Sequence, residues 1–197
     1  MIDLDLLFEF GGERRGLVKN EIIFEEGTFP AFYYQIIEGE VKMNNFTEDG
    51  KEFIQNIFTV GQSFGEPPLF IDEPYPANAV AITSSVVVQI PKNLFYTLLD
   101  THPEVSLAVN KSLARRLYYK SIMAPEISSQ DPEKRLLTLM DYLKSHQGTN
   151  SDEAYGIPMT RQQLADLTGL RVETVIRTIK QLERRGELEI IQRKIYR

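Results

Sequence analysis

The chain has 197 residues, 42% of them hydrophobic, with a formal net charge of −6 and no cysteine. The absence of cysteine excludes disulfides, thiolate nucleophiles, four-cysteine iron–sulfur clusters and zinc fingers, and His102 and His146 are not at ligand spacing from each other or from carboxylates. We therefore expect no metal, haem or other cofactor, and no enzyme, because no nucleophile and base occur together in a motif.

The apolar runs are far too short to span a membrane. The first ten residues, MIDLDLLFEF, lack the basic region that precedes the apolar part of a secretory signal. We therefore predict a cytoplasmic protein.

Residues 19–92 contain short apolar alternations that are broken by turn residues. Asp49-Gly50 is a strong hairpin signal, because this pair suits the positive φ angles of tight two-residue turns. Regular strands at this spacing predict a small antiparallel sandwich or barrel. The predicted corners are Gly27, Gly39, Gly50, Gly61 and Gly65.

After Pro91 the pattern changes to a helical period. Steps of four and three residues are typical of a coiled-coil seam, and here they join Ser106, Asn110, Leu113, Leu117, Lys120 and Ala124. Only two of these positions are strongly apolar, so a helix packed on the sheet is the alternative. Asn110 in a seam would fix the register at some cost in stability.

Proline fits poorly inside a helix, so we expect a break or kink near Pro125 and a hinge over Glu126–Gln130. Asp131-Pro132 then starts a new helix, with aspartate as N-cap and proline in the first turn. Its inner stripe is Leu136, Met140 and Leu143, and Gly148 ends it.

Two short amphipathic helices meet at Gly169. Thr160 and Gln163 have the spacing of a capping box, and Leu164 and Leu167 face inward from the first helix. The second helix has a core-facing stripe of Val172, Val175, Ile179 and Leu182. This arrangement predicts a helix-turn-helix.

The opposite face of the second helix bears Glu173, Arg177, Lys180 and Arg184. An ordinary solvated surface would also mix charges. However, arginine can bond guanine bidentately and glutamate can accept from cytosine, so Glu173 and Arg177 can read adjacent base pairs in a major groove. Arg171 and Thr174 flank this face and are placed for phosphates.

A basic hairpin follows Gly186, with Gln192-Arg193-Lys194 between apolar residues, and we interpret it as the wing of a winged helix. Charge supports a division between the halves of the chain. Residues 131–197 hold 12 Lys and Arg against 10 Asp and Glu, whereas residues 1–130 hold 10 against 18. The half with the helix-turn-helix is therefore the basic half.

The segment Arg171-Val172-Glu173-Thr174-Val175-Ile176-Arg177 resembles the recognition helix of the Crp/Fnr transcription regulators, close to S-R-E-T-V-x-R. The segments FEEG, IIEGEVKM and GQSFGE resemble the cyclic-nucleotide-binding β-roll of the same family. The resemblance implies an α+β fold in three parts. These are an antiparallel, jelly-roll-like β-roll sensor over residues 1–102, a dimerisation helix and hinge over 103–130, and a winged helix-turn-helix over 131–197.

The resemblance also implies a homodimer on a two-fold-symmetric DNA site. We expect dimer contacts from Asn110, Leu113 and Leu117, and base contacts from Glu173, Ile176 and Arg177. Phosphate contacts are expected from Thr160, Arg161, Arg171, Thr174, Lys180 and Arg193.

Two residues depart from the family pattern. Arg171 replaces a Ser or Thr cap, so about 1 kcal/mol of side-chain capping is missing or replaced by a phosphate contact. Ile176 replaces a common serine, and it meets a thymine methyl or packs under the wing.

The family's nucleotide pocket needs a Gly-Glu pair and, roughly ten residues on, an Arg-Ser pair for the cyclic phosphate. Gly65-Glu66 is present, but Pro74–Asn78 stands in place of Arg-Ser, and no cation occurs from Phe64 to Pro91. Pro67 and Pro68 also remove two backbone donors. We therefore predict that cyclic AMP is not the ligand. The expected pocket residues are Gly65, Glu66, Ala77 and Ser121, and the expected core aromatics are Tyr33, Tyr34, Phe64 and Phe70.

The expected partners are double-stranded DNA, a second copy of the chain and an unknown small-molecule effector. The polar loop Thr149–Gly156 is a plain connector or a contact for RNA polymerase, the role that the resemblance implies. An alternative function is a small-molecule-gated signalling module whose winged helix docks a protein partner. Salt-dependent binding to duplex DNA would separate the two functions.

Overall fold

The computed structural model describes residues 2–50, 52–129, 131–146 and 154–197. These residues form two compact units, Met1–Arg115 and Arg116–Arg197, which are described one at a time. In the parts of the chain that are described, no helix is long and apolar enough to cross a membrane.

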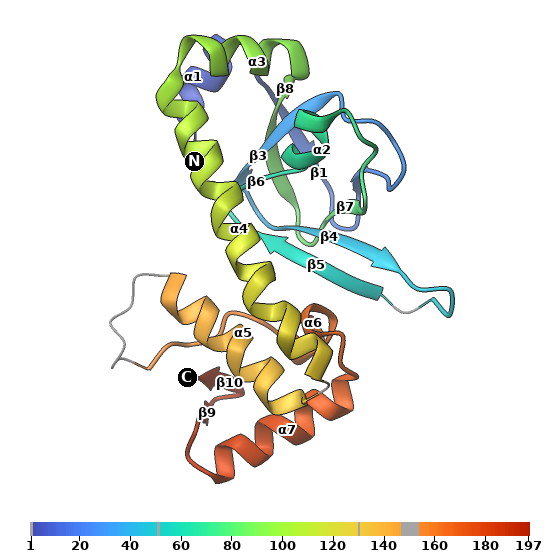
Figure 1. Cartoon of the computed structure of the whole chain (residues 1–197), viewed down its shortest axis with the longest axis vertical. Coiled ribbons are helices and arrows are strands. Elements are labelled where there is room, and N and C mark those ends of the chain that lie inside the picture. Colours follow the sequence, from blue (N-terminus) through green and yellow to red (C-terminus); the bar gives the residue numbers. More distant parts are fainter. Residues whose placement is uncertain (1, 51, 130, 147–153) are drawn as a thin grey trace. The chain divides into compact units, whose positions relative to one another are not determined.

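The N-terminal unit is an antiparallel β structure with short helices, as predicted (Figure 1). Its two sheets have the strand orders β1-β8-β3-β6 and β2-β7-β4-β5, and all of their pairings are antiparallel. The strands are β1 (Glu13–Leu17), β2 (Ile22–Phe24), β3 (Phe32–Glu38), β4 (Val41–Phe46), β5 (Glu52–Phe58), β6 (Ser63–Phe64), β7 (Asn78–Ala81) and β8 (Ser85–Pro91). The helices are α1 (Leu4–Glu9), α2 (Glu66–Ile71), α3 (Lys92–Thr101) and the first part of α4 (Pro103–Ser129).

The hairpin predicted at Asp49-Gly50 is present, but its strands stop pairing at Phe46 and Glu52, so the turn is longer than two residues. Within the turn, the Gly50 amide donates to the carbonyl of Thr47 at 2.8 Å. Gly50 has a φ of +76°, which an L side chain rarely adopts.

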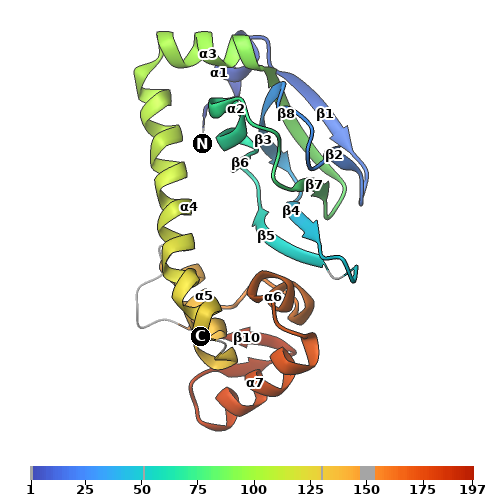
Figure 2. The same cartoon turned by 45° about the vertical axis from the view of Figure 1, so that its right-hand side comes forward.

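Strand alternation divides the apolar residues of this unit between two clusters. Tyr34 and Val87 belong to an inner cluster with Phe24, Phe64 and Tyr75. Their chain neighbours point to the other face, where Tyr33 and Val88 join an outer cluster with side chains of α1, α3 and α4. Figure 2 shows β1, β8 and β3 adjacent in one sheet. Buried Tyr33, Tyr34 and Phe64 are core residues as predicted, and Phe70 packs against the outer cluster.

Helix α4 continues through Pro125 to Ser129, so the predicted break is wrong. The proline removes only one backbone donor, and it lies four residues from the helix end, where few helical bonds depend on it. Within the C-terminal unit, buried Met123 and the contact between Tyr119 and Tyr142, whose ring centroids lie 4.1 Å apart, also anchor this part of the helix. The predicted hinge is wrong for Glu126–Ser129, which are helical, and Gln130 lies outside the described residues.

The C-terminal unit packs three further helices and a two-stranded hairpin around one core (Figure 1). The elements are α5 (Pro132–His146), α6 (Arg161–Thr168), α7 (Val172–Arg184), β9 (Glu189–Ile191) and β10 (Lys194–Tyr196). On α5, Leu136 and Met140 are buried as predicted, whereas Leu143 is half-buried and the unpredicted Leu139 is buried. Gly148, expected to end α5, and residues 149–153 of the expected loop lie outside the described residues.

Candidate nucleic-acid interface

Helices α6 and α7 form the predicted helix-turn-helix. The amide of Gln163 donates to Thr160 Oγ1 at 3.1 Å, and Gln163 Oε1 accepts from the Thr160 amide at 2.8 Å. The capping box is therefore confirmed. Gly169 ends α6 with a φ of +67°, and the Leu170 amide donates to the Ala165 carbonyl at 3.0 Å. Because this conformation strains residues with a β-carbon, glycine is needed at the turn.

Helix α7 has one buried and one exposed face. The predicted stripe is buried at Val175, Ile179 and Leu182, while Val172 is half-buried. Sequence reasoning missed Thr178, which is 3% exposed and extends the stripe. The side chains on the exposed face are Glu173, Ile176, Arg177, Lys180, Gln181, Glu183 and Arg184.

The predicted base-reading residues share this exposed face. Glu173 and Arg177 lie four residues apart, about one helical turn, and both are exposed. Ile176 beside them is 42% exposed, so much of its side chain is open to solvent. Thr174 is half-buried, and Arg171 is the N-cap of α7 without a side-chain capping bond. Arg171 therefore provides no side-chain cap to α7, as its residue type predicts.

The predicted wing is the antiparallel hairpin β9–β10. Its two turn residues, Gln192 and Arg193, have φ angles of +49° and +69°. Positive φ at both positions is the geometry of a type I′ turn. The guanidinium of Arg161, at the start of α6, donates to the carbonyl of Arg193. Arg161 therefore holds the wing turn beside α6, a contact that its expected role at a phosphate did not anticipate.

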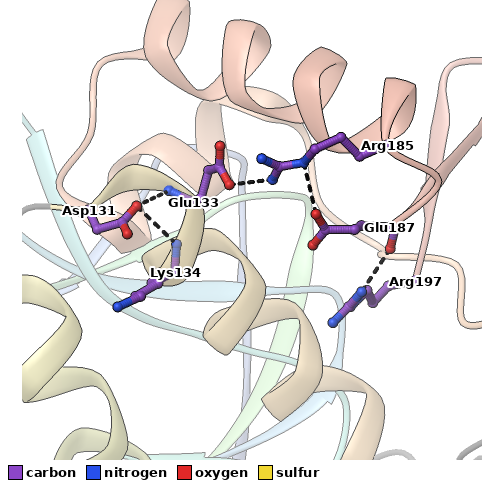
Figure 3. A network of polar contacts seen from close by, with 6 residues as sticks. All are labelled: Asp131, Glu133, Lys134, Arg185, Glu187 and Arg197. Carbon is purple, nitrogen blue, oxygen red and sulfur yellow. Dashed lines mark hydrogen bonds and ion pairs between the residues drawn. The ribbon is translucent and has the colours of Figure 1, made fainter.

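A polar network fixes the base of the wing (Figure 3). Arg197 donates to both carboxylate oxygens of Asp141, at 2.7 and 3.1 Å, and to the Glu187 carbonyl at 2.7 Å. Arg185 forms ion pairs with Glu133 and, at 2.9 Å, with Glu187. These contacts raise the pKa of Arg185, chiefly through Glu133, and that of Arg197, chiefly through Asp141. Arg185 and Arg197 therefore make contacts within the C-terminal unit. The cations on the exposed face of α7, Arg177, Lys180 and Arg184, are not part of this network.

A buried arginine joins α5 to the helix-turn-helix. Arg135 is 7% exposed, and its Nη1 donates to the carbonyl of Thr168 at 2.9 Å. Thr168 is the last residue of α6, where carbonyls lack helical partners and a positive charge is favourable. The guanidinium therefore caps α6. No local pattern predicts this contact, because it joins residues 33 positions apart.

The predicted dimer residues of α4 have different environments. Leu117 is 67% exposed and Asn110 is also exposed. Leu113 is half-buried and packs against the outer cluster of the N-terminal unit. Two more apolar side chains of α4, Leu107 and Tyr118, are 55% and 63% exposed. One face of the helix thus packs on the sheet, as the alternative interpretation held, and another face is open.

Three of the predicted pocket residues, Gly65, Glu66 and Ala77, belong to the N-terminal unit, and the fourth, Ser121, belongs to the C-terminal unit. Gly65, with a φ of +79°, precedes α2, and Glu66 and Ala77 are fully buried. Ser121 is exposed, belongs to the other unit, and its hydroxyl donates to the carbonyl of Leu117 at 2.9 Å. Around Gly65 the interior is filled by the aromatic side chains Phe24, Tyr34, Phe64 and Tyr75. In the described parts of the chain, no three His, Asp or Glu residues are grouped as a metal site would require.

Two family models match the two halves of the chain. The cyclic nucleotide-binding domain matches residues 14–102, and the Crp-like helix-turn-helix domain matches residues 134–196. Both matches agree with the two kinds of structure described above.

Individual proteins resemble the chain over most of its length. The cAMP-activated global transcriptional regulator CRP of Haemophilus influenzae is 31% identical over 153 residues, which is 76% of this chain and 68% of that protein. The nitrogen fixation regulation protein FixK of Bradyrhizobium diazoefficiens is 26% identical over 188 residues, 93% of this chain and 77% of that protein. A solved structure of the c-di-GMP responsive global regulator CLP of Xanthomonas campestris has a TM-score of 0.75 at 23% identity, covering 98% of both chains. This last likeness concerns the fold alone.

Proposed function

Because the chain belongs to the Crp/Fnr family of DNA-binding transcription regulators, we propose that it acts as a homodimer that reads a two-fold-symmetric site with α7. The observation that carries this proposal is the exposed face of α7, where Glu173 and Arg177 lie one turn apart above a buried apolar stripe. A major groove admits a helix in this orientation, with one face in the protein core and the other against the base edges.

Three side chains of α7 read the bases. The Arg177 guanidinium donates to O6 and N7 of a guanine, and the Glu173 carboxylate accepts from N4 of a cytosine in the neighbouring pair. Ile176, whose side chain is 42% exposed, supplies an apolar contact for a thymine methyl.

Backbone phosphates are contacted around this face by Thr160, Arg171, Thr174, Lys180 and Arg193. These contacts position the protein on the duplex and carry no sequence information. Arg161 has a double role, because its guanidinium also bonds the Arg193 carbonyl and so keeps the wing cation close to α6.

Dimerisation uses the open face of α4. Leu117 and Tyr118 are mostly exposed in the single chain, and burial of apolar side chains is the main driving force for association. Asn110 lies on the exposed part of the same helix, and two half-sites one turn of DNA apart require a two-fold pair of chains.

Cyclic AMP does not act as an effector of this chain. The Gly65–Glu66 pair is kept, but no cation occurs from residue 64 to 91, and Ala77 lies fully buried in the inner cluster. We also propose that the loop over residues 149–156 contacts RNA polymerase. The protein acts in the cytoplasm, where such DNA sites occur.

A selection of duplexes from a random-sequence pool, run on the purified protein without added ligand, tests this function. We expect one half-site to be enriched as an inverted repeat, with an affinity that falls steeply as salt rises. Failure to enrich any sequence, together with binding that salt does not weaken, would favour the signalling module that docks a protein partner.

A further inference from the structure

The aromatic ring of Tyr75 lies against Gly65, the first residue of the Gly65–Glu66 pair. Tyr75 is 3% exposed, and its ring stacks on Phe24 with centroids 3.6 Å apart and planes within 8°. A β-carbon built on Gly65 would lie 3.2 Å from Cε1 of Tyr75. The stretch that supplies the phosphate-binding cation in the family pattern thus places an aromatic side chain inside the sensor of this chain.

The segment around Tyr75 is fixed on both sides. The Gly27 amide donates to the Tyr75 carbonyl, and the Tyr75 amide donates to the Thr28 carbonyl, each at 2.8 Å. Asn45 Nδ2, from β4, donates to the carbonyl of the next residue, Pro76, at 2.7 Å. Because the backbone is paired before and after the ring, the position of Tyr75 is a built part of the fold.

The chemistry around the ring disfavours an anionic ligand. Glu66 is fully buried, and burial raises the pKa of the Tyr75 phenol, with Tyr34 and Glu66 adding to the rise, so the phenol stays neutral. Among the described residues, the Tyr75 hydroxyl has no hydrogen-bond partner. A ligand that used the Gly65–Glu66 pair would have to displace a stacked and buried aromatic ring, which is a large loss of apolar burial.

We propose that Tyr75 is a built-in occupant of the effector site, and that the chain therefore binds DNA without a small-molecule effector. The inference rests on the proposed function, because it presumes binding to a duplex. The inference also says how the sensor is regulated. Because the Tyr75 ring occupies the interior permanently, the DNA-binding state is populated without a bound ligand.

The wild-type chain provides the first test. A purified sample is assayed for binding to its selected duplex, and the same sample is denatured and its supernatant analysed by mass spectrometry. We expect DNA binding and no small molecule in a stoichiometric amount. A stoichiometric molecule released from a DNA-binding sample overturns the inference and leaves the proposed function intact. Failure to bind any duplex contradicts the proposed function itself.

Two variants provide the second test. Tyr75→Phe keeps the ring and should bind the duplex within about twofold of wild type, whereas Tyr75→Ala should lose about tenfold or more, because emptying the site lowers the population of the competent state. Millimolar p-cresol, which restores the missing ring, should recover part of the lost affinity. A folded Tyr75→Ala variant with wild-type DNA affinity overturns the inference. If Tyr75→Ala does not fold, the mass-spectrometric test on the wild-type chain decides.

Discussion

At the scale of single residues, the two faces of α7 separate stability from recognition. Val175, Ile179 and Leu182 are buried, whereas Glu173 and Arg177 are exposed and have no role in the core. Substitutions on the exposed face should therefore change DNA binding without unfolding the protein.

Arg177→Ala should weaken binding to the preferred duplex by about 1–3 kcal/mol and remove the preference for one guanine per half-site, because a bidentate contact is lost. Glu173→Ala should weaken the preference for one base at the neighbouring base pair. Fluorescence anisotropy on a panel of single-base duplex variants measures both effects. Gln181→Ala, on the same exposed face but assigned to no base, serves as the matched control and should keep the wild-type sequence preference. Wild-type sequence preference in both test variants would mean that α7 does not read the bases.

The wing turn stores local strain at Gln192 and Arg193, since their positive φ angles cost non-glycine residues roughly 1–2 kcal/mol each. Replacing the pair by Asn-Gly, which suits a type I′ turn, should raise the free energy of unfolding by about 1 kcal/mol in urea denaturation. Gly186→Ala should instead lower the free energy of unfolding, because Gly186 has a φ of +72°. Loss of stability in the Asn-Gly variant would contradict the assigned turn.

At the scale of elements, α4 is divided between two environments along its length. Val105, Val109 and Leu113 contribute to the outer cluster of the N-terminal unit, and Tyr119 and Met123 pack within the C-terminal unit. The exposed Leu117 lies between these anchors, so its proposed role in the dimer can be changed without removing a core residue.

Leu117→Glu should yield folded monomers, because a dimer would then hold two carboxylates against each other in an apolar seam. Light scattering measures the mass, and operator binding should weaken with it, since each half-site is then held singly. Arg115→Glu, about 200° away on the helix, is the control and should stay dimeric. A dimer of Leu117→Glu would place the interface elsewhere.

At the scale of the whole molecule, most local patterns in the sequence predicted the structure, whereas contacts between distant segments could not be predicted from it. The capping box of Thr160 and Gln163 joins residues three positions apart, and it was predictable from the residue types alone. Arg197 bonds Asp141 across 56 positions, so only the folded chain brings the pair together. The break predicted at Pro125 is wrong for a related reason, because contacts outside the local sequence hold the helix that contains it.

The pocket, too, was only partly predictable. The missing cation was visible in the sequence, but the stacking of Tyr75 on Phe24 was not, since these residues lie on separate segments of the chain. The absence of a cation predicts that an anion binds poorly, and the buried ring leaves little room for one.

Titration calorimetry with cyclic AMP and cyclic GMP should therefore show no binding at micromolar concentrations, and neither nucleotide should change DNA affinity. The reason is the lack of a countercharge for the cyclic phosphate, whose charge-assisted contacts are usually worth ~1.5–3 kcal/mol each. Replacing Pro76 and Ala77 by Arg and Ser supplies that partner, but the Tyr75 ring still fills the interior, so we expect weak affinity only when Tyr75→Ala is added. A clear micromolar isotherm for the wild type would require a phosphate partner from another part of the protein.

The two-faced construction of α7 also bears on how regulators of this kind diversify. Its buried stripe and its exposed face lie on opposite sides of one helix, and changes at independent positions are nearly additive in free energy. A gene duplicate could therefore acquire a new operator through two or three exposed substitutions while its thermal stability stayed almost constant. Mutational drift of the promoter sequence and of the protein can then proceed in small matched steps, and two copies in one genome can come to address separate sets of genes.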